Sequence, residues 1–145
     1  MPDVDLTEVY CEFAFVTNDH DCDLVTQKLG IEPSRCFNKG DKAPTKDANR
    51  ESFRPWGLWA LRSEPVIEED YSLDSHVKFL RKKLEDKVDE INGLRTEYNF
   101  KGEFLVSLDT EDITAGFDVA RDNLLFICSI AETFRCSLMT KAKFK

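Results

Sequence analysis

The sequence predicts a single α+β domain in which helices cover one face of an antiparallel sheet. The first reason is composition: a chain of 145 residues that is 41% hydrophobic and 33% charged can build one core without metals or disulfides. The second reason is periodicity, because segments alternating every second residue are interleaved with segments repeating at three- and four-residue steps. Their order, β-α-β-β-α-β and then α-β, is a ferredoxin-like plan extended by a C-terminal helix and strand, in one domain over residues 1–145.

The first predicted strand is VYCEFAFVT at residues 9–17, and its two-sided apolar character predicts a central position in the sheet. A short helix is predicted in the segment that follows, NDHDCDLVTQKLGIEPS. Asn18 or Asp19 can cap this helix, and Gly30 supplies a left-handed stop. The apolar face of the helix consists of Cys22, Val25 and Leu29.

Two more strands, SRCFNKG at residues 34–40 and WGLWALRS at 56–63, are joined by a long polar loop. Alternation places Trp56 and Trp59 on opposite faces of the second strand. One tryptophan therefore enters the core, and the other lies on the outer face or under the loop. Alternation alone does not say which of the two is exposed.

The longest predicted helix begins after Ser72 and ends at Asn92-Gly93. Its apolar stripe consists of Leu73, Val77, Leu80, Leu84, Val88 and Ile91. KGEFLVSLDT at residues 101–110 predicts the next strand. Residues 122–134 fit a helix or a buried strand, and the capping residue Asp122 favours the helix, with RCSLMTKAKF as the last strand.

Charge and composition narrow the classes of partner. The net charge of −8 disfavours nucleic acid and anionic membranes, and makes a cationic protein partner more plausible. No apolar run approaches the roughly 20 residues of a membrane span, and the N-terminus lacks the basic start of a signal peptide, so the expected location is cytoplasmic. The five cysteines include no CxxC pair and are expected to be free thiols.

The residues do not predict catalytic chemistry. NDHDCD at residues 18–23 could place His20 between carboxylates, but adjacent residues at a helix start point around the axis, and zinc ligands normally come from separated segments. We interpret this cluster as a helix start with acids at its positive end. His76 is expected at the edge of the long helix's apolar stripe. The sequence therefore predicts no catalytic residue, no metal and no cofactor, in a protein that is not an enzyme.

Three segments resemble a bacterial family of domains of unknown function, number 4279. They are LGIEPSRCFNKGD at residues 29–41, WGLWALRS, and the Ser/Asp-rich entry to the long helix. The resemblance covers roughly residues 8 to 144, and the loop between Gly40 and Trp56 and the Phe- and Lys-rich C-terminus depart from it. It implies no catalytic residues. It does imply a stoichiometric binding role, because some members are suspected immunity proteins that neutralise toxins.

The predicted function is a non-enzymatic protein-binding module, with an immunity protein that neutralises a basic toxin as its specific form. The alternative is a regulatory domain that binds a small molecule between the sheet and the loop after Gly40. The third hypothesis is an enzyme with a site around Asp19, His20 and Asp41. The chain is expected to be a monomer, or a homodimer formed through an open sheet edge.

A partner is predicted to bind the loop together with the acidic segment that follows the tryptophan-bearing strand. Carboxylates would steer a basic partner, an arginine would add a directed contact, and one of the two tryptophans would supply apolar contact. The predicted contact residues are Asp41, Arg54, Trp56, Trp59, Glu68, Glu69 and Asp70.

Overall fold

A computed structural model describes residues 6–63, 72–110 and 117–140 of the chain. One sheet contains β1 (Leu6–Thr17), β2 (Arg35–Phe37), β5 (Gly57–Arg62), β6 (Lys101–Thr110) and β7 (Thr133–Thr140), in the order β2-β5-β1-β6-β7. The α+β class is confirmed, and β1 lies at the centre of the sheet as its apolar pattern predicts.

The sheet is mixed, whereas the sequence analysis expected an antiparallel one. The first four strands in the spatial order are antiparallel to their neighbours, but β7 runs parallel to β6. The reason is the helix α4 (Arg121–Ile130), because a β-strand, a helix and a second neighbouring strand bring the chain back in the same direction. Residues 122–134 fitted either a helix or a strand, and α4 shows that the helix favoured by the sequence analysis is correct.

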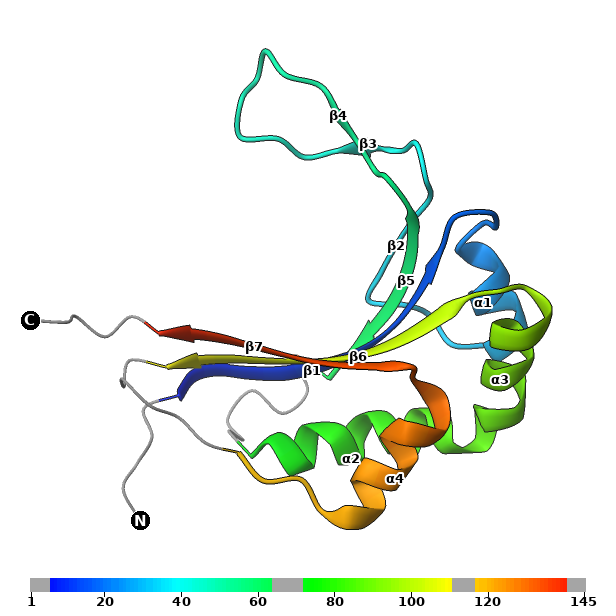
Figure 1. The fold of residues 1–145 in the computed structure, drawn as a ribbon. Coiled ribbons are helices and arrows are strands. Elements are labelled where there is room, and N and C mark those ends of the chain that lie inside the picture. The colour runs from blue at the N-terminus through cyan, green and yellow to red at the C-terminus, as the bar shows by residue number, and fades with distance from the viewer. Residues whose placement is uncertain (1–5, 64–71, 111–116, 141–145) are drawn as a thin grey trace, which may run out of the picture.

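The helices of the described residues lie on one side of the sheet (Figure 1). They are α1 (Asp23–Leu29), α2 (Leu73–Leu84), the 3₁₀ turn η1 (Glu85–Lys87), α3 (Val88–Glu97) and α4. The predicted single long helix is therefore interrupted at η1, and it continues past Asn92-Gly93 because Leu94 is buried and anchors one more turn. Asn99, with φ 56°, takes the left-handed conformation after the helix instead.

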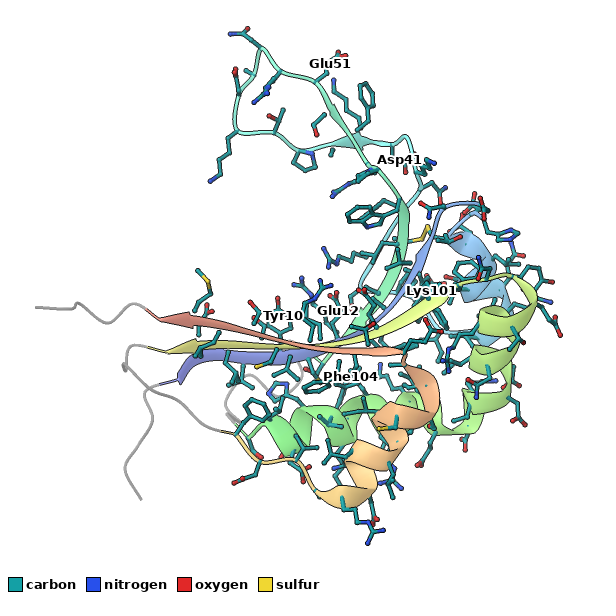
Figure 2. The ribbon with its side chains drawn as sticks, in the orientation of Figure 1. Tyr10, Glu12, Asp41, Glu51, Lys101 and Phe104 are labelled. Atoms are coloured by element: carbon teal, nitrogen blue, oxygen red, sulfur yellow. A yellow bond between two sulfur atoms is a disulfide. The ribbon has the colours of Figure 1, made fainter. Side chains whose placement is uncertain are left out.

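The helices and the sheet enclose one main core. Alternate residues of β1, β5 and β6 point toward the helices, and Figure 2 shows Phe104 on this side with Tyr10 and Glu12 on the other. The largest fully buried side chains are Trp59, Phe13, Phe15, Phe100, Phe104, Leu29, Leu80, Leu84, Ile91, Leu94, Leu108 and Ile130. In the described part of the chain, the opposite face of the sheet carries no helix, and we call it the open face.

The caps of two helices differ from the prediction. α1 begins after Cys22, whose N–H donates to Asn38 Oδ1 at 2.8 Å, so neither Asn18 nor Asp19 caps it. α4 begins after Ala120, whose N–H donates to Asp74 Oδ1 of α2 at 2.8 Å, so Asp122 is not its cap. This bond, together with one from Asn123, lowers the pKa of Asp74 and joins α4 to α2.

The long polar loop forms an arm that projects from the sheet. The arm (residues 41–54) contains β3 (Lys42–Ala43) and β4 (Ser52–Phe53), which pair with each other and not with the main sheet. Figure 1 shows it rising from the ends of β2 and β5 and curving over the open face. Two backbone bonds close its base, from Gly40 N–H to Arg54 O at 2.8 Å and from Arg54 N–H to Asp41 O at 2.7 Å.

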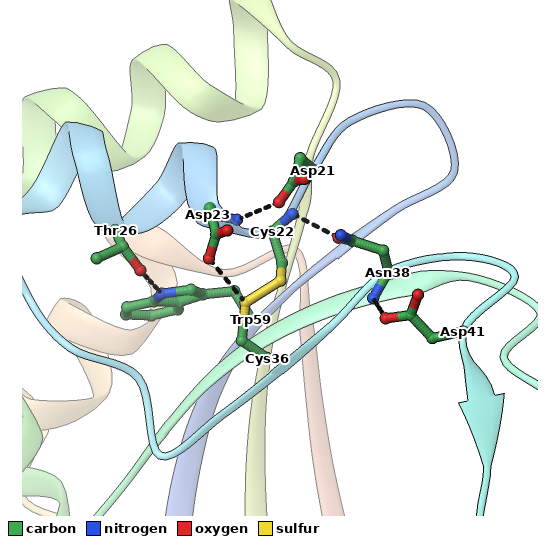
Figure 3. Close-up of a disulfide and its surroundings, with 8 residues drawn as sticks. All are labelled: Asp21, Cys22, Asp23, Thr26, Cys36, Asn38, Asp41 and Trp59. Carbon is green, nitrogen blue, oxygen red and sulfur yellow. Dashed lines mark hydrogen bonds between the residues drawn. A yellow bond between two sulfur atoms is a disulfide. The ribbon is translucent and has the colours of Figure 1, made fainter.

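The expectation of free thiols is wrong for two of the five cysteines. Cys22 and Cys36 form a disulfide with their Cα atoms 6.0 Å apart, shown in Figure 3. Cys36 points to the helix side of the edge strand β2, where the start of α1 packs, and this brings together cysteines that no sequence motif relates. Cys11, Cys128 and Cys136 are free, as expected.

Breaking this disulfide should destabilise the fold. It closes a loop with a sequence separation of 14, and cross-links of this size contribute about 2–4 kcal/mol. We expect Cys36→Ser to lower the free energy of unfolding by about this amount, measured by urea denaturation without reductant. Cys128→Ser, at an exposed position, should change it by less than about 0.5 kcal/mol. Equal stability of the wild-type protein with and without dithiothreitol would contradict the prediction.

Candidate functional site

The open face of the sheet has an apolar floor at its centre. Ala14, Leu58 and Ala60 are buried there as a second small cluster, with Val16 and Phe37 packed against them. These side chains come from β1, β5 and β2, on the face opposite the helices. No helix of the described residues covers this face, and larger polar and aromatic side chains surround the floor.

Those side chains enclose a groove of about 530 Å³. The groove lies on the open face of the sheet and reaches the base of the arm. It is lined by Glu12, Ala14, Val16, Arg35, Phe37, Arg54, Trp56, Leu58, Glu103, Leu105 and Arg135. Its volume falls within the range of ligand sites in proteins, and its apolar floor with a charged border is typical of them.

A buried carboxylate organises one end of the groove. Glu12 is 1% exposed, and its two oxygens accept hydrogen bonds from Arg35 Nη2 at 2.8 Å and Arg62 Nε at 2.6 Å. Arg35 lies on β2 and reaches Glu12 across β5, where its register partner is the small Ala60. Arg62 also lies over the ring of Tyr10, at 4.6 Å from the centroid. Two charge-assisted bonds thus satisfy a carboxylate that would be costly to bury alone.

Two further arginines, Arg54 and Arg135, border the groove, and their contacts within the protein are weaker than those of Arg35 and Arg62 with Glu12. The guanidinium of Arg54 lies 4.0 Å from the centroid of the Phe37 ring, and within the described residues it forms no ion pair. Arg135 on β7 is 3.7 Å from Glu103, with 63% of its side chain exposed. Both guanidinium groups can therefore take a carboxylate or phosphate from outside.

The charge inside the groove is opposite to that of the whole chain. Three arginines and two glutamates line it, and one of these glutamates, Glu12, is already neutralised by its two arginine partners. The chain as a whole has a net charge of −8. A locally positive, partly desolvated groove attracts anionic groups even in an acidic protein.

The structure places the predicted contact residues in different surroundings. Trp56 is 47% exposed and lines the groove with Arg54, so these two lie together. Trp59 is fully buried, and its indole N–H donates to Thr26 Oγ1 at 3.0 Å, so its prediction as a contact residue is wrong. Asp41 accepts a 2.7 Å bond from Asn38 N–H and holds the base of the arm. Glu68, Glu69 and Asp70 lie outside the described residues.

The acidic cluster before α1 takes part in local packing. Thr17 Oγ1 accepts bonds from the N–H groups of Asp19 and His20, and Asp21 Oδ1 accepts one from Asp23 N–H at 2.8 Å. The His20 ring contacts those of Tyr98 and Phe100, with centroids 5.4 and 5.7 Å away. These contacts agree with our interpretation of the cluster as a helix start.

Donor atoms of Cys22, Asp23 and Cys36 lie within 4.8 Å of one another, a spacing that could hold a metal ion. The two sulfurs are bonded to each other, however, and a disulfide offers no thiolate to a metal. Cys36 Sγ is 3.8 Å from Asp23 Oδ1. While the disulfide is intact, this cluster is a packing contact between α1 and β2.

Sequence analysis missed a buried Ser–His pair. Ser63 Oγ is 2.6 Å from His76 Nδ1 and accepts a bond from Cys11 N–H at 3.1 Å, and both side chains are buried. His76 therefore lies inside the core and not at its edge. Burial raises the pKa of the neighbouring Cys11 thiol to about 12, which keeps it protonated. These contacts tie the end of β5 to β1 and α2.

The fold and the groove define a small α+β domain with an arginine-bordered groove on one face of its sheet. The model of the family described as "Domain of unknown function (DUF4279)" matches residues 7–137, so the chain belongs to the DUF4279 family, and the resemblance noted in the sequence is confirmed. Comparisons with curated proteins and with solved structures give no match. No helix in the described part of the chain has the length and apolar character of a membrane span.

The contribution of the Glu12 ion pair can be isolated with a double-mutant cycle. Arg62→Met should lower the free energy of unfolding by about 2–3 kcal/mol, because Glu12 stays buried with one of its two partners lost. In a Glu12→Gln background the same change should cost less than about 1 kcal/mol, since no buried charge is left unpaired. Urea denaturation of the four proteins measures both values. An equal loss in the two backgrounds would show that Arg62 stabilises the fold independently of the Glu12 charge.

Proposed function

We propose that this protein is a non-enzymatic protein-binding module that holds a segment of its partner in the groove. The observation that carries the proposal is the joint placement of Trp56, Arg54 and Arg135 around an apolar floor. Tryptophan and arginine are the residues most enriched at energetically dominant positions of protein interfaces. The described helices all lie on the other side of the sheet, which leaves room along this face for a partner segment.

The chemistry of the groove favours a segment that combines acidic and apolar residues. Carboxylates would pair with Arg54 and Arg135, in the bidentate geometry that guanidinium groups prefer. Apolar side chains would pack on Trp56, Phe37 and the floor. Phe53 on the arm is 56% exposed and would extend this apolar contact beyond the groove.

An immunity protein that neutralises a basic toxin is the specific form of this proposal. The net charge of −8 supports attraction to a basic partner. The toxin is inferred from the resemblance stated in the sequence analysis, since some members of this family are suspected immunity proteins. The two charge patterns are compatible, because a basic protein can place one carboxylate-bearing segment in the groove while its cationic surface meets the acidic surface around it.

Two further expectations belong to this proposal. The order β2-β5-β1-β6, with helices on one face, supports an extended ferredoxin-like plan in which β7 is the addition. The cytoplasm is the location inferred from the sequence. Disulfides are rarely maintained there, so in that compartment the Cys22–Cys36 bond would have to resist reduction by glutathione.

The alternative, a regulatory domain that binds a small molecule, is supported by the volume of the same groove. A small carboxylate or phosphate ligand could use the same arginines. A ligand that binds only the folded state raises the melting temperature, so a thermal-shift screen of anionic metabolites addresses this alternative directly.

The proposal can be tested by affinity capture from the organism that encodes the chain, with quantitative mass spectrometry. We expect at least one protein to be captured by the wild type and lost, by about tenfold or more, with the variant Arg54→Glu/Trp56→Ala. The matched control is Arg121→Glu/Phe117→Ala, which changes an exposed arginine and an exposed apolar residue outside both the groove and the arm. The control should capture the same protein as the wild type.

Two results would count against protein binding. One is that every captured protein is recovered equally with the groove variant and the control. The other is that nothing is captured while an anionic metabolite stabilises the wild type and not the groove variant. The second result would favour the regulatory domain, and circular dichroism of all variants would confirm that they are folded.

A further inference from the structure

The exposed apolar side chains gather at one edge of the molecule. Of the eight large hydrophobic side chains that are exposed among the described residues, five belong to α4 and β7: Leu124, Leu125, Phe134, Leu138 and Met139. These two elements are consecutive in the chain, and Figure 1 shows them at the same edge of the sheet. Exposed apolar side chains concentrated in one region of a domain commonly mark an interaction surface.

β7 is also an edge strand of the described sheet. It is eight residues long, TFRCSLMT, and in the described structure it pairs with β6 on one side only. Natural proteins usually protect such edges with proline, bulges or charges. The register of β7 with β6 is continuous, without a bulge, and β7 contains no proline. Its single charged residue is Arg135, so β7 has little of this protection. The opposite edge, β2, has three residues and is too short for comparable pairing.

We propose that two copies of the chain associate by antiparallel pairing of their β7 strands around a two-fold axis at Cys136. Phe134, Cys136 and Leu138 share the helix-side face of β7, where Phe134 stacks on Phe104 at 6.4 Å between centroids. An axis at Cys136 places Phe134 opposite the partner's Leu138, and Cys136 opposite the partner's Cys136. The row of apolar side chains is therefore self-complementary, as a two-fold interface requires.

The charge of β7 permits a second copy as the occupant of this edge. Two molecules with a net charge of −8 each repel one another over most of their surface. The β7 segment contains no carboxylate, so pairing here brings no acidic groups together. The same axis places Arg135 opposite the partner's Ser137, so the two arginines do not oppose each other directly.

The association has a consequence for the groove. A two-fold axis perpendicular to the sheet joins the two five-stranded sheets into one continuous sheet, with both open faces on the same side. Arg135 lies on β7 and lines the groove, so the two grooves would be neighbours across the junction. The dimer therefore presents two equivalent binding sites to one large partner or to two small ones. The pairing itself does not depend on what the groove binds.

Light scattering coupled to size-exclusion chromatography tests the association. We expect the wild-type peak to have a molar mass of twice the chain mass of 16.7 kDa. Leu138→Lys should raise the dissociation constant of the dimer by about tenfold or more. The matched control is Phe53→Lys, because Phe53 is 56% exposed and Leu138 is 48% exposed, and Phe53 lies on the arm. The control should remain dimeric. A wild type that is still monomeric at about 100 μM, a concentration well above the dissociation constant of a stable dimer, would overturn the proposal. A Leu138→Lys variant that remains fully dimeric would also overturn it.

The native cysteines provide a second test that does not depend on Leu138. Opposed residues in an antiparallel pair have Cα atoms about 4.5–5.5 Å apart, which is within the range of a disulfide. Mild oxidation by copper phenanthroline, which accepts the two electrons as two thiols lose their protons, should cross-link the partners through Cys136. Cys128→Ser should still form the covalent dimer, and Cys136→Ser, which keeps the exposed Cys128, should not. Cross-linking through Cys128 instead would overturn the β7 pairing.

Discussion

The ion-pair cluster around Glu12 is the interaction on which the open face of the sheet depends. Its carboxylate lies on the central strand, 1% exposed, and is satisfied by Arg35 from β2 and Arg62 from β5. A carboxylate in that position would be unstable without both partners. The cluster therefore ties together the three strands at the side of the sheet from which the arm rises. Arg35 and Arg62 are paired with Glu12, so the groove arginines available to a ligand are Arg54 and Arg135.

Arg54 and Trp56, at the base of the arm, form part of the groove wall. A disulfide and several hydrogen bonds fix the position of this base. The disulfide joins β2 to the start of α1, and Asn38, two residues after Cys36, accepts the N–H of Cys22. Asp41 accepts the N–H of Asn38, and the backbone of Arg54 pairs with that of Asp41 (Figure 3 shows the side-chain bonds). Arg54 and Trp56 are thereby positioned over the sheet without being part of it. Preorganised side chains of this kind lose less entropy on binding.

Local patterns in the sequence predict what depends on neighbouring residues, and miss what depends on distant ones. Alternation correctly separates Trp56 from Trp59, and the apolar spacing correctly finds the helix within residues 122–134. Gly93 misleads because the burial of Leu94 outweighs the low helix propensity of glycine. The disulfide and the partners of Glu12 join segments up to 50 residues apart, and no spacing rule relates them. The one available signal was Glu12 itself, a charged residue within an otherwise apolar central strand.

An NMR titration tests most directly whether this acidic protein presents a locally cationic groove with Trp56 at its border. The probe is an acetylated hexapeptide of alternating Glu and Leu, with the Lys–Leu peptide as control, and the readout is the two indole N–H signals and the arginine Nε–H signals. We expect the Glu–Leu peptide to shift Trp56, Arg54 and Arg135, while the buried Trp59 and the distant Arg121 stay unchanged. Stronger shifts with the Lys–Leu peptide, or shifts confined to residues outside the groove, would contradict the account.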